Sequence, residues 1–115
     1  MKLHIETSSE AAIVRPLEDI DPSNSSQFER ALAARVDEGT KCLIIDFSRV
    51  GYIESSGIGA IVRAHRRMKE ISGEIVLAGC NENLQKIFKL INFHRYFRMV
   101  QTAAEVIALL RGPKA

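Results

Sequence analysis

Residues Lys41 to Ile71 read KCLIIDFSRVGYIESSGIGAIVRAHRRMKEI, and this stretch determines the fold class. Its first part is an unbroken apolar run, which predicts a strand over 41–47 that is covered on at least one face and lies near the centre of a sheet. From about Ser56 to Ser72 the apolar residues recur at helical spacing, with basic residues mostly on the opposite face. A strand, a connecting loop and an amphipathic helix are therefore expected in succession, as in α/β proteins.

The same alternation of strand and helix patterns continues on both sides of this stretch. An N-terminal hairpin is expected first, and Pro16 within its second strand indicates an edge position or an early end. Ser23 or Asn24 can cap the first helix and Asn81 or Asn83 the third, and Thr102 with Glu105 forms a capping box for the last one. Gly39 and Gly73 are expected to end the first and second helices. The other predicted strands lie at about 2–6, 11–17, 74–78 and 98–100, and the other helices at about 24–38, 82–91 and 102–110.

This order, β-β-α-β-α-β-α-β-α, predicts a single small α/β domain. Helical crossovers between successive strands make the sheet mostly parallel, whereas the initial hairpin makes it mixed. We expect the domain to occupy residues 1–111 and a C-terminal tail to occupy residues 112–115. A chain of 115 residues can bury about 65% of its unfolded surface and needs neither disulfides nor a metal to fold.

Composition narrows the function classes. The hydrophobic content of 46% and the charged content of 26% are typical of a globular protein in water, and a net charge of +2 is too small to indicate nucleic-acid binding. No segment reaches the roughly 18 apolar residues of a membrane span, and the N-terminus does not have the pattern of a secretory signal. Two widely spaced cysteines, Cys42 and Cys80, predict reduced thiols and a cytoplasmic location.

The segment Glu54 to Gly59, ESSGIG, allows four interpretations. A serine can cap the helix, although one cap does not explain two serines and two glycines. The lysine of a nucleotide-binding loop is missing, and no glycine stands two residues before either serine, as a nucleophile elbow requires. His4, His65 and His94 are available as bases for hydrolase chemistry, but His65 lies on the predicted helix near its apolar stripe. The fourth interpretation is that a serine here accepts a phosphate, which the N–H groups of a helix N-terminus stabilise.

The chain resembles the STAS family, specifically the stand-alone bacterial anti-sigma factor antagonists. The resemblance rests on Asp46-Phe47-Ser48, Val50, Tyr52-Ile53 and the segment from Glu54 to Gly59. It extends upstream to Ile20-Asp21, Asn24 and Phe28, and downstream to GEIVLAG at 73–79 and LQKIFKLINFHRYF at 84–97. The family usually has aspartate where this chain has Glu54, and often glycine where it has Glu18.

The resemblance implies a function in partner switching. An unphosphorylated antagonist binds an anti-sigma factor that is also a serine kinase, and a sigma factor is released. The kinase phosphorylates the antagonist to end the interaction, and a metal-dependent serine phosphatase restores it. The resemblance places the phosphate on Ser55, the serine directly after the acidic residue, with Ser56 as a helper or cap. It also implies that Asp21 lies near Ser55 at the docking surface.

We therefore expect a non-enzymatic regulator with no catalytic residue, cofactor, metal, nucleic-acid or membrane partner. The alternative from another class is a STAS subunit of a transport or lipid-trafficking assembly. The residues expected to contact the partner are Asp21, Asn24, Asp46, Glu54, Ser56, Gly57, Ile58 and Arg63.

Three further features allow more than one interpretation. Asp21 and Asp46 can be metal ligands, but isolated acids at loop ends more often bond loop amides. The basic helix face can be a solvated surface, a contact for an acidic partner or, less readily, a nucleic-acid site, since no aromatic stacking platform accompanies it. That face consists of Arg63, Arg66, Arg67 and Lys69. The aromatic residues near the C-terminus are expected to pack in the core rather than to form a cofactor site; they are Phe88, Phe93, Tyr96 and Phe97.

Overall fold

The computed structural model, which describes residues 1–112, has a five-stranded sheet in the order β1-β2-β3-β4-β5. The first two strands are antiparallel, and every later pair is parallel. The strands are β1 (Leu3–Thr7), β2 (Ala12–Pro16), β3 (Cys42–Asp46), β4 (Glu74–Ala78) and β5 (Arg98–Val100). The helices are α1 (Ser25–Asp37), α2 (Ser55–Glu70), α3 (Glu82–Leu90) and α4 (Ala103–Arg111). The predicted α/β class and element order are confirmed, while the predicted tail lies, beyond Gly112, outside the described residues.

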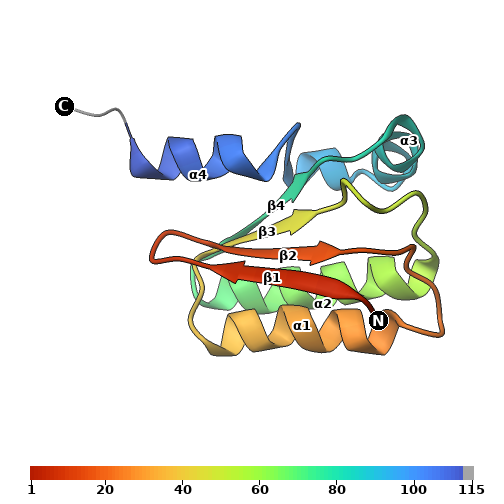
Figure 1. Ribbon diagram of the computed structural model, residues 1–115, viewed down its shortest axis with the longest axis horizontal. Coiled ribbons are helices and arrows are strands. Elements are labelled where there is room, and N and C mark those ends of the chain that lie inside the picture. The colour runs from red at the N-terminus through yellow and green to blue at the C-terminus, as the bar shows by residue number, and fades with distance from the viewer. Residues whose placement is uncertain (113–115) are drawn as a thin grey trace.

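Helices cover the two faces of the sheet unequally. Figure 1 shows α1 and α2 side by side on one face and α4 on the other, with α3 near the ends of β3 and β4. All five residues of β3 are buried, as expected for the central strand. Leu43 and Ile45 face α1 and α2, whereas Cys42 and Ile44 face α4, because successive side chains of a strand point to opposite faces.

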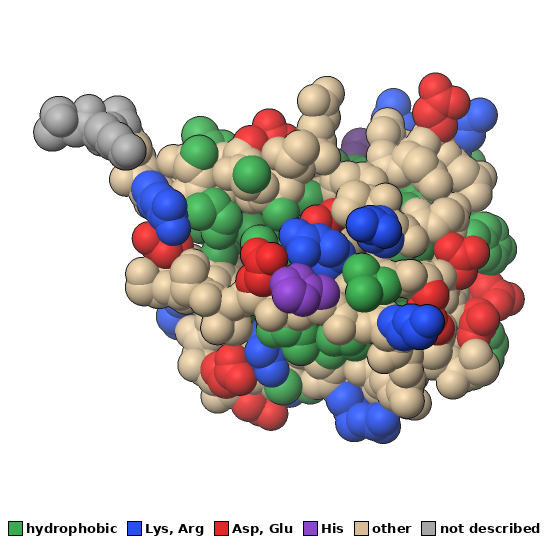
Figure 2. All heavy atoms as spheres, viewed as in Figure 1, with side chains coloured by type: hydrophobic (Ala, Val, Ile, Leu, Met, Phe, Trp, Pro, Cys, Tyr) green, Lys and Arg blue, Asp and Glu red, His purple; other side chains and the backbone are tan. Residues whose placement is uncertain are grey.

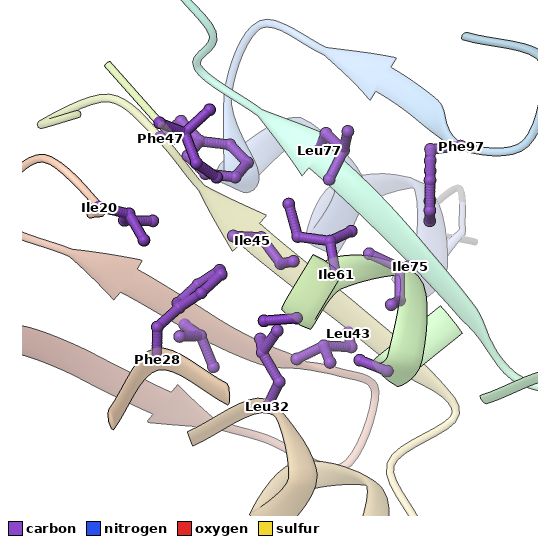
Figure 3. Packing of buried hydrophobic residues seen from close by; sticks show 14 of the residues in the cluster. Ile20, Phe28, Leu32, Leu43, Ile45, Phe47, Ile61, Ile75, Leu77 and Phe97 are labelled. Atoms are coloured by element: carbon purple, nitrogen blue, oxygen red, sulfur yellow. The ribbon is translucent and has the colours of Figure 1, made fainter. Parts of the chain in front are cut away.

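The larger core lies between the sheet and the α1–α2 pair. Phe28 and Leu32 of α1 and Ile61 of α2 meet the side chains of β3 and β4, as Figure 3 shows. All three are fully buried. Burying each such side chain stabilises the fold by about 1.5–3 kcal/mol, so the amphipathic stripes of the two helices hold them on this face.

The ends of β2 and α2 differ in part from the sequence-based predictions. Pro16 is the last residue of β2 and pairs with Leu3 of β1, so the early end is confirmed and the edge position is wrong. The helix end expected at Gly73 is made instead by Ser72, which has a left-handed φ of 57°. Gly73 is closely packed, since a Cβ there would lie 3.0 Å from the carbonyl oxygen of Lys41 and 2.7 Å from Cε of the fully buried Met68.

Capping was predicted correctly at the later helices. Asn81 accepts a hydrogen bond from the N–H of Leu84 at the start of α3, and Thr102 forms the expected capping box with Glu105. Gly39 follows α1 with a φ of 81°, as expected for a helix end. A short 3-10 helix, Phe93–Arg95, was not predicted because three residues are too few to show a helical period.

Candidate functional site

The loop between β3 and α2 brings the ESSGIG segment to the edge of the sheet where the parallel strands end. Buried Val50 and Ile53 anchor this loop, whereas Tyr52, Glu54 and Ser55 are exposed. In open parallel sheets this edge collects binding residues, because the connecting loops meet there.

Ser55 is the first residue of α2, and its side chain is exposed. The preceding Glu54 occupies the N-cap position, but its side chain makes no capping hydrogen bond. The interpretation of Ser55 or Ser56 as the helix cap is therefore wrong. The first N–H groups of a helix have no partner within it, so this turn keeps donors and the positive end of the helix dipole for an anion.

Ser56 has a different environment from Ser55. Its Oγ is buried and has no hydrogen-bond partner among residues 1–112. Such a hydroxyl is poorly placed to attack or to accept a group from outside. The structure therefore distinguishes the adjacent serines, with Ser55 as the accessible one.

Gly57 allows α2 to begin close to the neighbouring loop. A Cβ at this position would lie 2.6 Å from Ile20 and 2.8 Å from Ile53. At Gly59 a Cβ would meet only the end of the Arg63 side chain, at 3.1 Å. The first glycine is therefore required by packing, and the second is not.

A second segment, Glu18 to Asn24, lies against the ESSGIG loop. Ile20 forms an isolated parallel bridge with Ile53, in which Ile20 N–H donates to Tyr52 and Glu54 N–H donates to Ile20. This bridge brings the loop containing Asp21 and Asn24 to the start of α2. It supports the expected proximity of this loop to Ser55.

The polar residues of the second segment bond mainly to their own loop. Asp21 accepts hydrogen bonds from the backbone N–H and the hydroxyl of Ser23, which lower the pKa of its carboxyl. Asn24 is buried, and its side chain bonds Glu18, the carbonyl of Asp19 and the N–H of Asp21. Asn24 occupies the N-cap position of α1, as predicted, but neither its side chain nor that of Ser23 makes a capping hydrogen bond. Asn24 instead holds the shape of the loop.

Comparison with known proteins identifies the domain type. The protein-family model described as the STAS domain matches residues 2–106 of this chain. The chain belongs to the STAS domain family.

Two curated relatives share this STAS domain. BtrV of Bordetella bronchiseptica, provisionally described as an anti-sigma factor antagonist, is 25% identical over 92 residues, which cover 80% of this chain and 79% of BtrV. An anti-sigma-B factor antagonist of Listeria monocytogenes is 32% identical over 73 residues. That match covers 63% of each protein, less than two thirds of its length.

Solved structures have the same fold. The anti-sigma factor antagonist SpoIIAA in its unphosphorylated form has a TM-score of 0.79 at 21% identity, with coverage of 97% of this chain and 100% of SpoIIAA. The phosphorylated Bacillus SpoIIAA has a TM-score of 0.75 at 20% identity and coverage of 92% and 96%. At these identities the similarity establishes the STAS fold.

Asp46 belongs to a group of contacts that does not include Ser55. Its side chain is buried on the α4 side of the sheet, where it accepts hydrogen bonds from Nε of Arg15 at 2.8 Å and from the N–H of Ser48 at 2.9 Å. Burial is the largest influence and opposes ionisation, but Arg15 and Ser48 together outweigh it and lower the pKa of Asp46. The preference for loop bonding over metal ligation agrees with these contacts.

Arg63 is also separated from Ser55, by eight residues or about 12 Å along α2. It makes a bidentate ion pair with Glu29 of α1, at 2.6 and 2.8 Å. Arg67 pairs with Asp37 across the same two helices, through one nitrogen and one carboxylate oxygen. Two of the four residues of the predicted basic face thus form ion pairs between α1 and α2. Figure 2 shows acidic and basic side chains interspersed on the visible face, rather than one continuous basic surface.

The remaining candidates are accounted for by packing. His65 lies about 15 Å along α2 from Ser55 and packs edge-on against Phe97, with ring centroids 4.7 Å apart. Burial and the nearby Lys69 lower its pKa. Phe88, Phe93 and Phe97 are core residues as predicted, but Tyr96 is 65% exposed and is not.

Residues 1–112 contain no group of three or more His, Cys, Asp or Glu side chains placed to hold a metal ion. None of the described helices combines the length and apolarity needed to cross a membrane.

The candidate site is centred on Ser55, and the expected residues that lie on the same turn or on the loop bridged to it are Asp21, Asn24, Glu54, Ser56, Gly57 and Ile58. Sequence reasoning missed Asp19, whose carboxylate bonds the loop before Ser55. Its only signal in the sequence was its place just before the Ile20-Asp21 pair.

Proposed function

We propose that this STAS domain is an anti-sigma factor antagonist. In this proposal it binds a serine-kinase anti-sigma factor, a sigma factor is released, and phosphorylation of Ser55 ends the interaction. The observation that carries the proposal is an exposed serine hydroxyl at the first position of an uncapped helix.

The names of related proteins support the regulatory class. Antagonists of anti-sigma factors occur among both the sequence relatives and the proteins of the same fold. One of these proteins, SpoIIAA, has been solved in unphosphorylated and phosphorylated forms. A fold that holds a phosphate in a relative is a suitable scaffold for the same modification here.

The chemistry of the switch is a phosphoryl transfer. The Ser55 Oγ attacks the γ-phosphorus of ATP on the kinase, the bond to the β-phosphate oxygen breaks, and ADP and the serine proton leave. The new phosphoserine carries about −1.5 to −2 charges. Uncapped N–H groups at the start of α2 can donate hydrogen bonds to the phosphate oxygens, so the free domain remains folded.

The effect on binding follows from desolvation. A docked interface around Ser55 excludes water, and removing water from a dianion there costs several kcal/mol even when backbone N–H groups bond some of its oxygens. The carboxylate of Glu54, the residue before Ser55, adds a further negative charge beside the phosphate. Since about 1.4 kcal/mol corresponds to a tenfold change in affinity, phosphorylation weakens binding by orders of magnitude.

The proposed docking surface consists of the start of α2 and the loop packed against it by the Ile20–Ile53 bridge. Its accessible members are Asp21, Glu54, Ser55 and Ile58, while buried Asn24, buried Gly57 and the buried hydroxyl of Ser56 shape the loop and the start of the helix beneath them. Asp46 and Arg63 are positioned to support the sheet and the α1–α2 pair instead. The domain supplies a binding surface and a substrate serine in the cytoplasm, with no catalysis of its own, and a metal-dependent serine phosphatase reverses the modification.

The experiment is a pull-down from the source cells with wild type, Ser55→Ala and Ser55→Asp, followed by mass spectrometry. A kinase-type anti-sigma factor should be recovered with wild type and Ser55→Ala and depleted with Ser55→Asp. Recovery of membrane transporter subunits, equally with all three variants, would contradict the proposal and favour a structural role in a transport assembly.

A further inference from the structure

The loop that precedes Ser55 is held by a residue far from it in sequence. Oδ1 of Asp19 accepts hydrogen bonds from the N–H of Gly51 at 2.7 Å and from the N–H of Tyr52 at 3.1 Å. Hydrogen bonds to an ionised carboxylate are about twice as strong as those between neutral groups. One exposed acid therefore fixes two successive peptide units of the loop.

The other side of the same loop is held by Asn81. Its Nδ2 donates to the carbonyl of Gly51 at 3.3 Å, while its Oδ1 accepts from Leu84 N–H at 2.8 Å and caps α3. Gly51 is thus bonded through both its N–H and its carbonyl. A Cβ at this glycine would lie 3.3 Å from Oδ1 of Asp19, so the close approach of the carboxylate favours glycine.

The chain continues from this anchor to the serine with further support. Ile20 N–H donates to the carbonyl of Tyr52 at 3.2 Å, and Glu54 N–H donates to the carbonyl of Ile20 at 2.9 Å. The Asp19 contacts thus extend the row of bonds between the two loops toward Gly51. Without them, Gly51 keeps only the bond from Asn81, and Tyr52 keeps only the bond from Ile20, among the hydrogen bonds of residues 1–112 between this loop and its neighbours.

We propose that Asp19 is a positioning residue that holds the 51–54 loop so that Ser55 is presented to the kinase. This inference rests on the proposed function. Asp19 does not touch the reacting atoms; it acts through Gly51 and Tyr52. A reacting hydroxyl that is displaced by about 1 Å can slow a reaction about 100-fold, so the order of this loop matters for the transfer.

The first test uses the isolated domain and amide hydrogen exchange. Glu18 provides a matched control because it is a neighbouring carboxylate that also accepts two bonds, from Lys2 N–H and from Nδ2 of Asn24, but none from this loop. Asp19→Ala should accelerate exchange at Gly51 and Tyr52 by about tenfold or more. Glu18→Ala should leave these two amides unchanged. Unchanged exchange in Asp19→Ala would overturn the inference.

The second test measures phosphorylation of Ser55 by the kinase recovered in the pull-down, with each variant shown to be folded. Asp19→Ala should lower kcat/KM by about 10- to 100-fold, mainly through kcat. Asp19→Asn, which keeps an acceptor oxygen without the charge, should recover much of that loss. The control here is Glu105→Ala, since Oε1 of Glu105 also accepts from two successive backbone N–H groups, those of Gln101 and Thr102, but lies outside the proposed docking surface; it should stay within about threefold of wild type. Equal rates for Asp19→Ala and Glu105→Ala would overturn the positioning role. If wild type itself is not phosphorylated on Ser55, the proposed function and the positioning role fail together, whereas the exchange result still decides whether Asp19 holds the loop.

Discussion

Asp46 and Ser56 both carry buried polar atoms, but the surroundings of these atoms are opposite. Asp46 is buried and ionised beside Arg15, whose side chain keeps 25% exposure. Ser56 has a buried Oγ without a partner among the described residues. A buried charge with good partners stabilises the fold, whereas a buried hydroxyl without one destabilises it.

Asp46→Asn should reduce the free energy of unfolding at pH 7 by about 1–3 kcal/mol, because Arg15 loses a charged acceptor. The lowered pKa of Asp46 means that its stabilising effect is present above the unfolded pKa of about 3.9 and is lost as pH falls through the folded value. The difference between wild type and variant should therefore narrow below about pH 4. Urea unfolding from pH 7 to pH 2 provides the measurement, and a constant difference over that range would show that the carboxylate charge is not the cause.

Ser56→Ala should leave the free energy of unfolding unchanged or raise it by up to about 1 kcal/mol, since it removes an unpartnered buried hydroxyl. Ser55→Ala is the matched control on the same turn and should change it by less than about 1 kcal/mol, because Ser55 caps nothing. Chemical denaturation of both variants tests this. A loss above about 2 kcal/mol for Ser56→Ala would mean that its hydroxyl has a partner.

The start of α2 is the element on which the site depends. Its first turn combines a missing cap at Glu54 with a glycine, Gly57, that lets the helix contact Ile20 and Ile53. The helix thus begins at the place set by the packing of these two residues rather than by a capping side chain.

Gly57→Ala should destabilise the domain by about 1–3 kcal/mol, because the new methyl group would overlap the buried Ile20 and Ile53. Gly59→Ala is the comparison on the same helix and should be neutral or stabilising by up to about 1 kcal/mol, since it gains helix propensity and displaces only the end of Arg63. Thermal or urea unfolding of the pair measures the contrast. Equal effects of the two substitutions would contradict the packing argument.

Glu54→Asp should stabilise the domain by about 0.5–1 kcal/mol, because the shorter side chain is a preferred N-cap that can reach the free N–H groups of α2. Calorimetric melting gives the size of the change. A variant that melts below wild type would show that the longer side chain of Glu54 is needed in another contact.

Apolar patterns in the sequence were sufficient to predict the nine strands and α-helices of residues 1–112, because the apolar residues of each element form a continuous run or follow a strand or helix repeat. The contacts that depend on two distant segments were not predictable. Asp46 lies two and four residues after Ile44 and Cys42, so the sequence predicts that all three point to the same face of the sheet. The sequence did not show which face packs against α2 and which packs against α4. Asp19 lacked any local pattern, since its two donors are 32 and 33 residues away. Ser55 itself came from the family resemblance and stays a prediction.

At the scale of the whole molecule, the sheet separates support from binding. Two helices seal one face and α4 covers the other, while the loops that hold Ser55, Asp21 and Asn81 meet beyond the ends of the strands (Figure 1). A site carried on loops above a packed sheet can gain a phosphate without disturbing the core. The domain is therefore expected to respond to phosphorylation through its partner surface and not through unfolding.

Titration calorimetry of the unphosphorylated and the Ser55-phosphorylated domain against its kinase-type anti-sigma factor tests the central claim most directly. Phosphorylation should weaken binding by at least about 100-fold, while Ser55→Ala binds like the unphosphorylated wild type and Ser56→Ala still accepts phosphate. Circular dichroism of the phosphorylated domain should match that of the unmodified one. Unchanged affinity after modification of Ser55, or phosphate found only on Ser56, would contradict the account.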